Sequence, residues 1–277
     1  MPRGHHYNRS FLSAPDRAEV VAWLSKLVPL WEQRYSTLRP PPESQPQRGL
    51  LRPVYWLGNW QFACLDYYRP PNGLRDRCVR AERFPPVLQR LVAKMEEKTR
   101  TMFRKGDDIP PGWTLNTCLV NFYGDRLEGD RWVDVARVGE HKDFEPGPVA
   151  SLSLGERALL QFVTSRRPGE RDGVVLEQWL EDGSLQVFGG REWKEETFHR
   201  VQRVDHRGGH LLPPEVTGFR TRRVNFTFRF VPDAHVQRFC ELSPQARDDV
   251  REYMQTLARS SAWFRAELAA ERRAQGA

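Results

Sequence analysis

The chain has 277 residues, of which 39% are apolar, 29% charged and 11% aromatic. This aromatic content excludes a mostly disordered chain, because it can bury enough surface to offset the ordering entropy. The net charge is +7, from 43 Lys and Arg against 36 Asp and Glu, and only six of the 43 are lysine. An arginine excess suits phosphate and base recognition. Codon usage in a GC-rich genome explains it equally well, so charge alone does not identify a nucleic-acid partner.

The expected compartment is the cytoplasm, and a membrane partner is not expected. No run of about 18 apolar residues predicts a membrane span, and the first seven residues, MPRGHHY, do not resemble a secretory signal. The cysteines are scattered without a C-x-x-C pair, which argues against structural zinc and favours reduced thiols. They are Cys64, Cys78, Cys118 and Cys240. We expect a monomer.

The first part of the chain predicts two helices around an aromatic segment. Residues 13 to 35 have helical spacing of apolar side chains with Ser13 as cap, and Pro29 should kink or shorten the end. A proline-rich loop at 39–49 leads to a strand-like segment at 55–62, and residues 85–86, both proline, open the second helix.

From residue 115 the pattern changes to short strands separated by glycine, proline and charged turns. The predicted strands are 115–123, 149–154, 158–164, 173–180, 185–189, 198–204 and 223–231. Because no helical pattern lies between them, they favour antiparallel pairing in a sandwich or barrel. One further helix, capped by Ser243 and lined as far as Leu268, ends the chain. The expected fold class is α+β, a β core with flanking N-terminal and C-terminal helices.

Two histidines and one acid form a candidate metal site. His141 and Asp143 are two residues apart, so in an extended segment they point to the same face, and His199 on a later strand can complete the site. Two imidazoles and one carboxylate leave about three octahedral positions open, the arrangement used for non-haem Fe(II) and O₂ chemistry. The same side chains could instead bind zinc. An H-x-D motif on its own is more often part of a solvent-exposed turn than of a metal site.

The segment 223–229 alternates polar and apolar side chains. Arg223, Asn225, Thr227 and Arg229 share one face, and the residues between them are apolar. A buried arginine must be paired, because an unpaired buried charge is very costly. A dicarboxylate ligand would pair with it; the alternative is an edge strand with solvated arginines.

Taken together, these motifs resemble the AlkB family of Fe(II)- and 2-oxoglutarate-dependent dioxygenases. The residues that carry the resemblance follow the order N-x-Y, H-x-D, H and R-x-N-x-x-x-R. They are Asn121, Tyr123, His141, Asp143, His199, Arg223, Asn225 and Arg229. The segment 148–155, PVASLSLG, is also similar to that family, and the resemblance covers about residues 55–231.

The resemblance implies a double-stranded β-helix, or jelly roll, with Fe(II) between its two sheets. It assigns the iron to His141, Asp143 and His199. It assigns the distal carboxylate of 2-oxoglutarate to Arg223, helped by Tyr123 and Asn225, and places Asn121 and Arg229 nearer the end that chelates the metal. The chain would then divide into a helical flank and substrate-facing lid at 1–110, a jelly-roll dioxygenase core at 111–235 and a C-terminal helix at 236–277.

The implied reaction uses O₂ and 2-oxoglutarate to hydroxylate an N-alkyl carbon, releasing formaldehyde, succinate and CO₂. The family's usual substrates are alkylated bases in DNA or RNA. The residues that we expect to contact such a base or its phosphates are Tyr55, Trp56, Trp60, Arg75 and Arg77. For most aromatics of this region, a place in the core is the stronger interpretation. The charged segments 124–140 and 200–222 are longer than we expect and should border the substrate opening.

Three alternatives remain at this point. The same chemistry on a protein side chain or small metabolite is the nearest one. A metal-free jelly roll that only binds nucleic acid is weaker, and a zinc hydrolase is the weakest, because it gives no role to the arginine-bearing strand.

Overall fold

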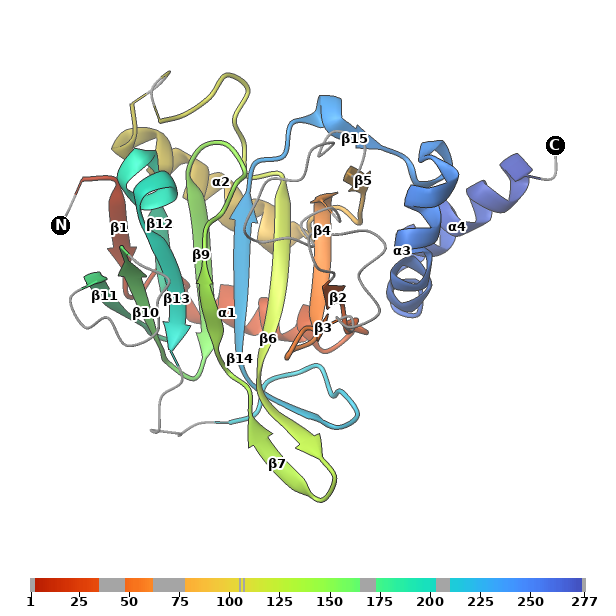
Figure 1. Ribbon diagram of the computed structural model, residues 1–277, viewed down its shortest axis with the longest axis horizontal. Coiled ribbons are helices and arrows are strands. Elements are labelled where there is room, and N and C mark those ends of the chain that lie inside the picture. The colour runs from red at the N-terminus through yellow and green to blue at the C-terminus, as the bar shows by residue number, and fades with distance from the viewer. Residues whose placement is uncertain are drawn as a thin grey trace.

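The computed structural model describes residues 3–34, 48–61, 78–104, 106, 108–164, 173–202 and 210–275. Two sheets of mainly antiparallel strands form its centre, and helices lie against the larger one (Figure 1). This arrangement confirms the predicted mixed fold with a jelly-roll core and flanking helices. No helix in the described part of the chain combines the length and apolar character that crossing a membrane requires.

The larger sheet has nine strands. Their order is β1 (His5–Asn8), β12 (Leu185–Phe188), β9 (Val149–Gly155), β14 (Phe219–Arg229), β6 (Thr117–Glu128), β4 (Val54–Gln61), β5 (Cys78–Arg80) and β15 (Val236–Gln237), with β7 (Arg131–Asp134) paired to β6. The smaller sheet has the order β11 (Val174–Leu180), β10 (Ala158–Val163), β13 (Phe198–Gln202) and β8 (Val138–His141). A separate pair joins β2 (Gln33–Arg34) to β3 (Arg48–Gly49).

Strict alternation along β14 gives the large sheet one apolar and one polar face. Val224, Phe226 and Phe228 are fully buried in the main hydrophobic core. That core includes residues of α1 (Ala14–Leu24) and α2 (Pro86–Met102), which cover this face (Figure 1). The polar residues between them line a cavity that β8, β10 and β13 close from the other side. Burial of the apolar face therefore fixes which side chains reach the cavity.

The first helix is shorter than predicted. It ends at Leu24, with Ser25 as C-cap, because the Ser25 hydroxyl bonds back to the Ala22 carbonyl at 2.9 Å and Pro29 follows closely. Leu27 and Leu30 still enter the core from the irregular segment beyond it.

The prediction of a single C-terminal helix starting at Ser243 is wrong. Ser243 caps a helix as expected, its hydroxyl accepting from the Ala246 amide at 3.3 Å. That helix is α3 (Pro244–Leu257), however, and a second one, α4 (Ala262–Gln275), follows it. Ser261 separates them, because its hydroxyl accepts from the Phe264 amide at 3.4 Å and starts the new helix.

The charged segment 124–140 is mostly regular structure. β6 continues to Glu128, turns back as β7, and the chain then crosses into the small sheet as β8 (Figure 1). Within segment 200–222, residues 203–209 lie outside the described part of the chain. Residues 35–47, which include the predicted end of the first helix and most of the predicted proline-rich loop, also lie outside it. The predicted division of the chain into three parts at residues 110 and 235 stays a prediction. Strands β1 and β4 precede residue 110 but pair with β12 and β6 of the large sheet.

Candidate metal and co-substrate site

Pairing within the small sheet brings the three predicted metal ligands together. His141 ends β8 and lies opposite His199 of β13, and Asp143 follows two residues later. The ligand atoms of all three lie within 4.8 Å of one another. The Nε2 atom of His199 is 3.5 Å from Oδ2 of Asp143, and the two imidazole rings are 4.1 Å apart between centres. Side chains separated by 58 residues of sequence thus converge on one point.

The hydrogen bonds around these side chains leave a suitable donor set. The Nδ1 atom of His141 lies 2.8 Å from the Gly139 carbonyl, so Nδ1 carries the proton and the lone pair is on Nε2. Oδ1 of Asp143 accepts from Arg229 Nε at 2.8 Å. Oδ2 is buried and has no hydrogen-bond partner in the described part of the chain. Two imidazole nitrogens and one carboxylate oxygen fit Fe(II), with other positions left for co-substrate and O₂.

Burial keeps the two histidines in the form that binds metal. It lowers the pKa of His199 to about 3, with His141 acting in the same direction. Burial also lowers the pKa of His141, against the opposing charge of Asp143. For Asp143 itself, burial acts to raise the pKa, but opposing charges, of which that of Arg229 is the largest, outweigh it and lower the pKa. Neutral imidazoles beside an ionised carboxylate are the protonation states that a divalent metal requires.

A candidate anion site lies beside the candidate metal site, on β14 and its neighbours. Arg223 is 3% exposed and donates to Ser153 at 3.0 Å, whereas its Nε and Nη1 have no hydrogen-bond partner in the described part of the chain. Asn225 is held by Ser151, whose hydroxyl accepts from it at 2.8 Å. The guanidinium of Arg223 lies 4.9 Å from the ring centre of Tyr123. Unused donors on a buried guanidinium fit a carboxylate ligand.

The other two predicted co-substrate residues also line this cavity. Arg229 pairs with Asp143 at 2.6 Å and with Glu145 at 3.5 Å, so it contacts a metal ligand directly. Asn121 accepts a hydrogen bond from Arg52 at 2.8 Å. Both side chains line the same cavity as the three metal ligands.

Several residues of the site were absent from the sequence-based predictions. Ser151 and Ser153 alternate along β9 in a segment that already resembled the family, and this alternation was a usable signal. Arg52 precedes β4 and has no such pattern around it. Lys194 is also a new member; it donates to the Gly147 carbonyl at 3.0 Å and to the Glu145 carbonyl, just after the H-x-D motif.

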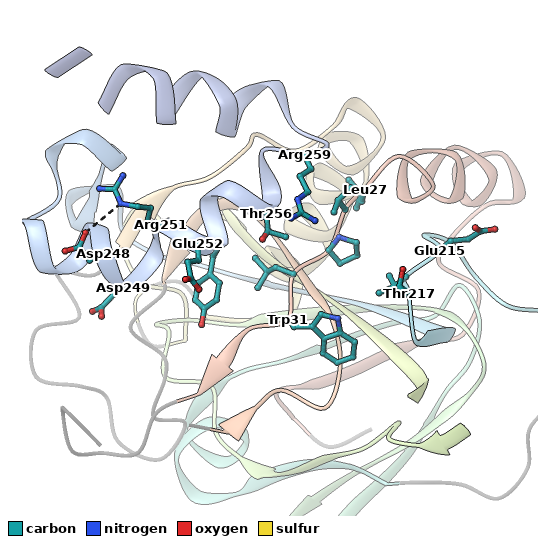
Figure 2. Close-up of a pocket in the computed structure, with 15 residues that line it drawn as sticks. Leu27, Trp31, Glu215, Thr217, Asp248, Asp249, Arg251, Glu252, Thr256 and Arg259 are labelled. Carbon is teal, nitrogen blue, oxygen red and sulfur yellow. Dashed lines mark ion pairs between the residues drawn. The ribbon is translucent and has the colours of Figure 1, made fainter. Parts of the chain in front are cut away.

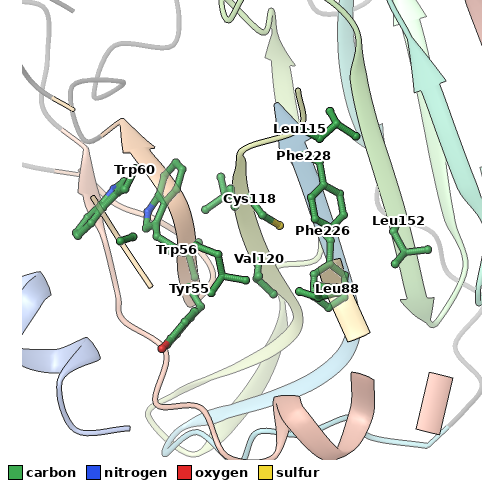
Figure 3. Packing of buried hydrophobic residues seen from close by; sticks show 14 of the residues in the cluster. Tyr55, Trp56, Trp60, Leu88, Leu115, Cys118, Val120, Leu152, Phe226 and Phe228 are labelled. Atoms are coloured by element: carbon green, nitrogen blue, oxygen red, sulfur yellow. The ribbon is translucent and has the colours of Figure 1, made fainter. Parts of the chain in front are cut away.

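Three of the residues expected to contact substrate lie in the core instead. Tyr55 and Trp60 are fully buried and Trp56 is 3% exposed. They pack among apolar side chains, and Trp56 stacks on Trp60 at 5.9 Å between ring centres (Figure 3). A base cannot stack on rings that other side chains already cover, so this expectation is corrected. Arg75 and Arg77 lie outside the described residues.

A larger cavity lies elsewhere and has a different chemistry. It measures about 1000 Å³ and lies between the segment after α1 and helix α3 (Figure 2). Its lining includes the acids Asp248, Asp249, Glu252 and Glu215, but no histidine or cysteine among the described residues. Among the described residues, the group of histidines and acids that could hold a metal ion is His141, Asp143 and His199, in the cavity between the two sheets.

Comparison with known proteins agrees with this geometry. The sequence profile of the 2OG-Fe(II) oxygenase superfamily matches residues 4–229. A curated relative, the DNA N(6)-methyladenine demethylase ALKBH1D of Arabidopsis thaliana, is 25% identical over 202 residues, which are 65% of this chain and 42% of that protein. The chain thus spans less than half the length of this relative.

A solved structure shares the fold. The structure of OsALKBH1 superposes with a TM-score of 0.52 at 22% identity, covering 83% of this chain and 99% of that one. The resemblance to the AlkB family seen in the motifs is thereby confirmed. The chain belongs to the 2OG-Fe(II) oxygenase superfamily, and His141, Asp143 and His199 are its candidate Fe(II) ligands.

Proposed function

We propose that this enzyme removes N-methyl groups from nucleic-acid bases by oxidation, with His141, Asp143 and His199 as iron ligands. The observation that carries the proposal is the meeting of these three side chains beside a buried arginine with unused donors. A facial metal site fits Fe(II), and a buried arginine beside it fits a dicarboxylate co-substrate.

The chain's own residues orient the co-substrate. Arg223, with Tyr123 and Asn225, receives the distal carboxylate, and the serine hydroxyls of β9 hold Arg223 and Asn225 in place. Arg229 keeps Oδ1 of Asp143 occupied, so the carboxylate presents Oδ2 to the metal. Asn121 would lie nearer the end of the co-substrate that binds the metal. These contacts are made before the reaction begins, which lowers the entropic cost of orientation.

Iron, when bound, supplies the oxidising chemistry that couples the decarboxylation of 2-oxoglutarate to hydroxylation of a C–H bond. The surrounding protein excludes water from this reaction, because Phe162 and Phe188 pack within 5.7 Å and 5.2 Å of the His199 ring. A hydroxylated N-methyl group breaks down to formaldehyde and the demethylated amine.

The nucleic-acid substrate is supported by the relative and by composition. The Arabidopsis relative is named for action on N6-methyladenine in DNA, and the chain carries a net charge of +7, rich in arginine. We therefore infer N6-methyladenine in DNA as the first substrate to examine. A base held in a duplex must leave the stack to reach a site between two sheets.

A panel of methylated oligonucleotides tests the proposal. We expect single-stranded DNA with N6-methyladenine to stimulate succinate release and to yield formaldehyde in equal amount, with Fe(II), ascorbate and 2-oxoglutarate present. The unmethylated oligonucleotide is the control. If methylated DNA and RNA all leave succinate release unchanged, the substrate is a protein side chain or a small metabolite instead.

A further inference from the structure

Arg52 is a buried arginine in the wall of the active-site cavity. It stands just before β4 and is 6% exposed. The neighbouring Pro53 carbonyl accepts a hydrogen bond from the Phe122 amide at 3.1 Å, which ties this segment to β6. Arg52 lines the same cavity as the metal ligands and Arg223.

Two contacts direct Arg52 toward the co-substrate residues. Its Nε donates to Oδ1 of Asn121 at 2.8 Å. Its guanidinium carbon lies 4.9 Å from the ring centre of Tyr123, the same distance as that of Arg223. One tyrosine ring therefore contacts two guanidinium groups, and its π-system stabilises both.

The charges of these two arginines are not balanced by the chain. No carboxylate of the described residues forms an ion pair with Arg52 or Arg223. Glu156, the acid whose charge acts on Arg223, pairs with Arg222 at 3.3 Å. Burial and the charge of Arg52 both lower the pKa of Arg223. Two buried cations side by side are costly unless an anion joins them.

Arg229 provides a comparison within the same cavity. It is as buried as Arg52, at 6% exposure, but pairs with the carboxylates of Asp143 and Glu145. The charge of Arg229 is therefore balanced by acids of the protein itself. The absence of an acid beside Arg52 and Arg223 in the described part of the chain thus indicates a ligand anion.

We propose that Arg52 is a second cation for the distal carboxylate of 2-oxoglutarate, shared with Arg223 across Tyr123. This assignment rests on the proposed role of Arg223. Two guanidiniums and a tyrosine favour a dianionic 2-oxo acid over one without the distal carboxylate. The depth of Arg52 argues against a phosphate of a nucleic-acid substrate, because phosphates stay near solvent.

The experiment compares two 2-oxo acids on the Mn(II)-loaded protein. The probes are 2-oxoglutarate and 2-oxopentanoate, which has the same five carbons but no distal carboxylate. Binding is followed through the water-proton relaxation of Mn(II), which changes when a 2-oxo acid displaces metal-bound water. This readout needs neither turnover nor a nucleic acid, so the proposed substrate can fail while this inference holds.

For Arg52→Met we expect an affinity for 2-oxoglutarate at least about tenfold weaker, with that for 2-oxopentanoate within about twofold of wild type. Arg52→Lys keeps the charge and should lose less, which maintains the test if the methionine variant does not fold. Arg90→Met, an exposed arginine of α2 paired with Glu19, is the control for net charge.

Equal weakening for both acids would overturn the proposal, because Arg52 would then act on the metal end through Asn121. Unchanged binding of both acids, together with a loss of affinity for a methylated oligonucleotide, would assign Arg52 to the substrate instead. Failure of wild-type protein to discriminate between the two acids would also contradict it.

Discussion

At the scale of single residues, the site depends on which buried charges the chain pairs and which it leaves to a ligand. Arg229 is held by Asp143 and Glu145, whereas Arg223 keeps two nitrogens without a partner in the described part of the chain. Both arginines lie on β14 and face the same cavity. Charge pairing and burial also set the protonation states of the proposed metal ligands. Arg229 stabilises the charge of Asp143, and burial keeps His199 neutral.

The low pKa of His199 makes the metal-free protein sensitive to acid. The folded-state pKa of about 3 lies below the ordinary value of 6.5, so the unfolded chain binds this proton first. The free energy of unfolding therefore falls as the pH drops below 6.5, by about 2 kcal/mol from this group at pH 5. Denaturant unfolding of chelator-treated protein between pH 7.5 and pH 5 measures the slope.

The variant His199→Gln should lose this part of the slope, since it has no proton to gain. His210→Gln is the matched control, because His210 is exposed. Identical slopes for His199→Gln and wild type would show that His199 is not held neutral by burial.

At the scale of elements, a short π-helix, η3 (Glu192–Glu196), connects the third proposed iron ligand to the first two. It leads directly into β13, which carries His199. Lys194 on this helix is half-buried and donates to the carbonyls of Glu145 and Gly147, in the turn after Asp143. Lys194 therefore acts as a positioning residue: it holds the turn that fixes Asp143, without touching the ligand atoms.

Removing this connection should weaken metal binding before it affects the co-substrate. We expect Lys194→Met to lower the affinity for Mn(II) about tenfold in the absence of 2-oxoglutarate, in line with other residues that support metal ligands. The metal-saturated variant should retain the wild-type KM for 2-oxoglutarate. Lys26→Met removes an exposed lysine and serves as control. Unchanged Mn(II) affinity would mean that the turn keeps its shape without Lys194.

The elements also show how far sequence patterns predict a site. Alternation along 223–229 and the H-x-D spacing are local, so they predicted the two faces of β14 and the close approach of His141 and Asp143, both of which the structure shows. The bond from Arg52 to Asn121 joins residues 69 apart, and no local pattern encodes it. The prediction that Trp56 and Trp60 contact substrate is wrong for a related reason. The sequence around an aromatic residue does not show whether its side chain is buried in the core or exposed to solvent.

At the scale of the whole molecule, the two sheets divide the tasks. The large sheet carries the proposed co-substrate residues on β6 and β14, and the small sheet carries His141 and His199 on β8 and β13. Helices α1 and α2 cover the outer face of the large sheet (Figure 1), so its central strands are buried on one side and the cavity lies on the other. Iron and co-substrate bound at the proposed residues would contact both sheets, so their binding should raise the thermal stability of the domain.

The most direct test of the account is the iron content of the protein after anaerobic loading and removal of unbound metal. We predict one Fe(II) per chain for wild type, and loss of stoichiometric iron in Asp143→Ala and His199→Ala with circular dichroism unchanged. Both variants should also lose succinate formation. If either one retains a full equivalent of tightly bound Fe(II), the three side chains do not form the iron site, and the account is contradicted.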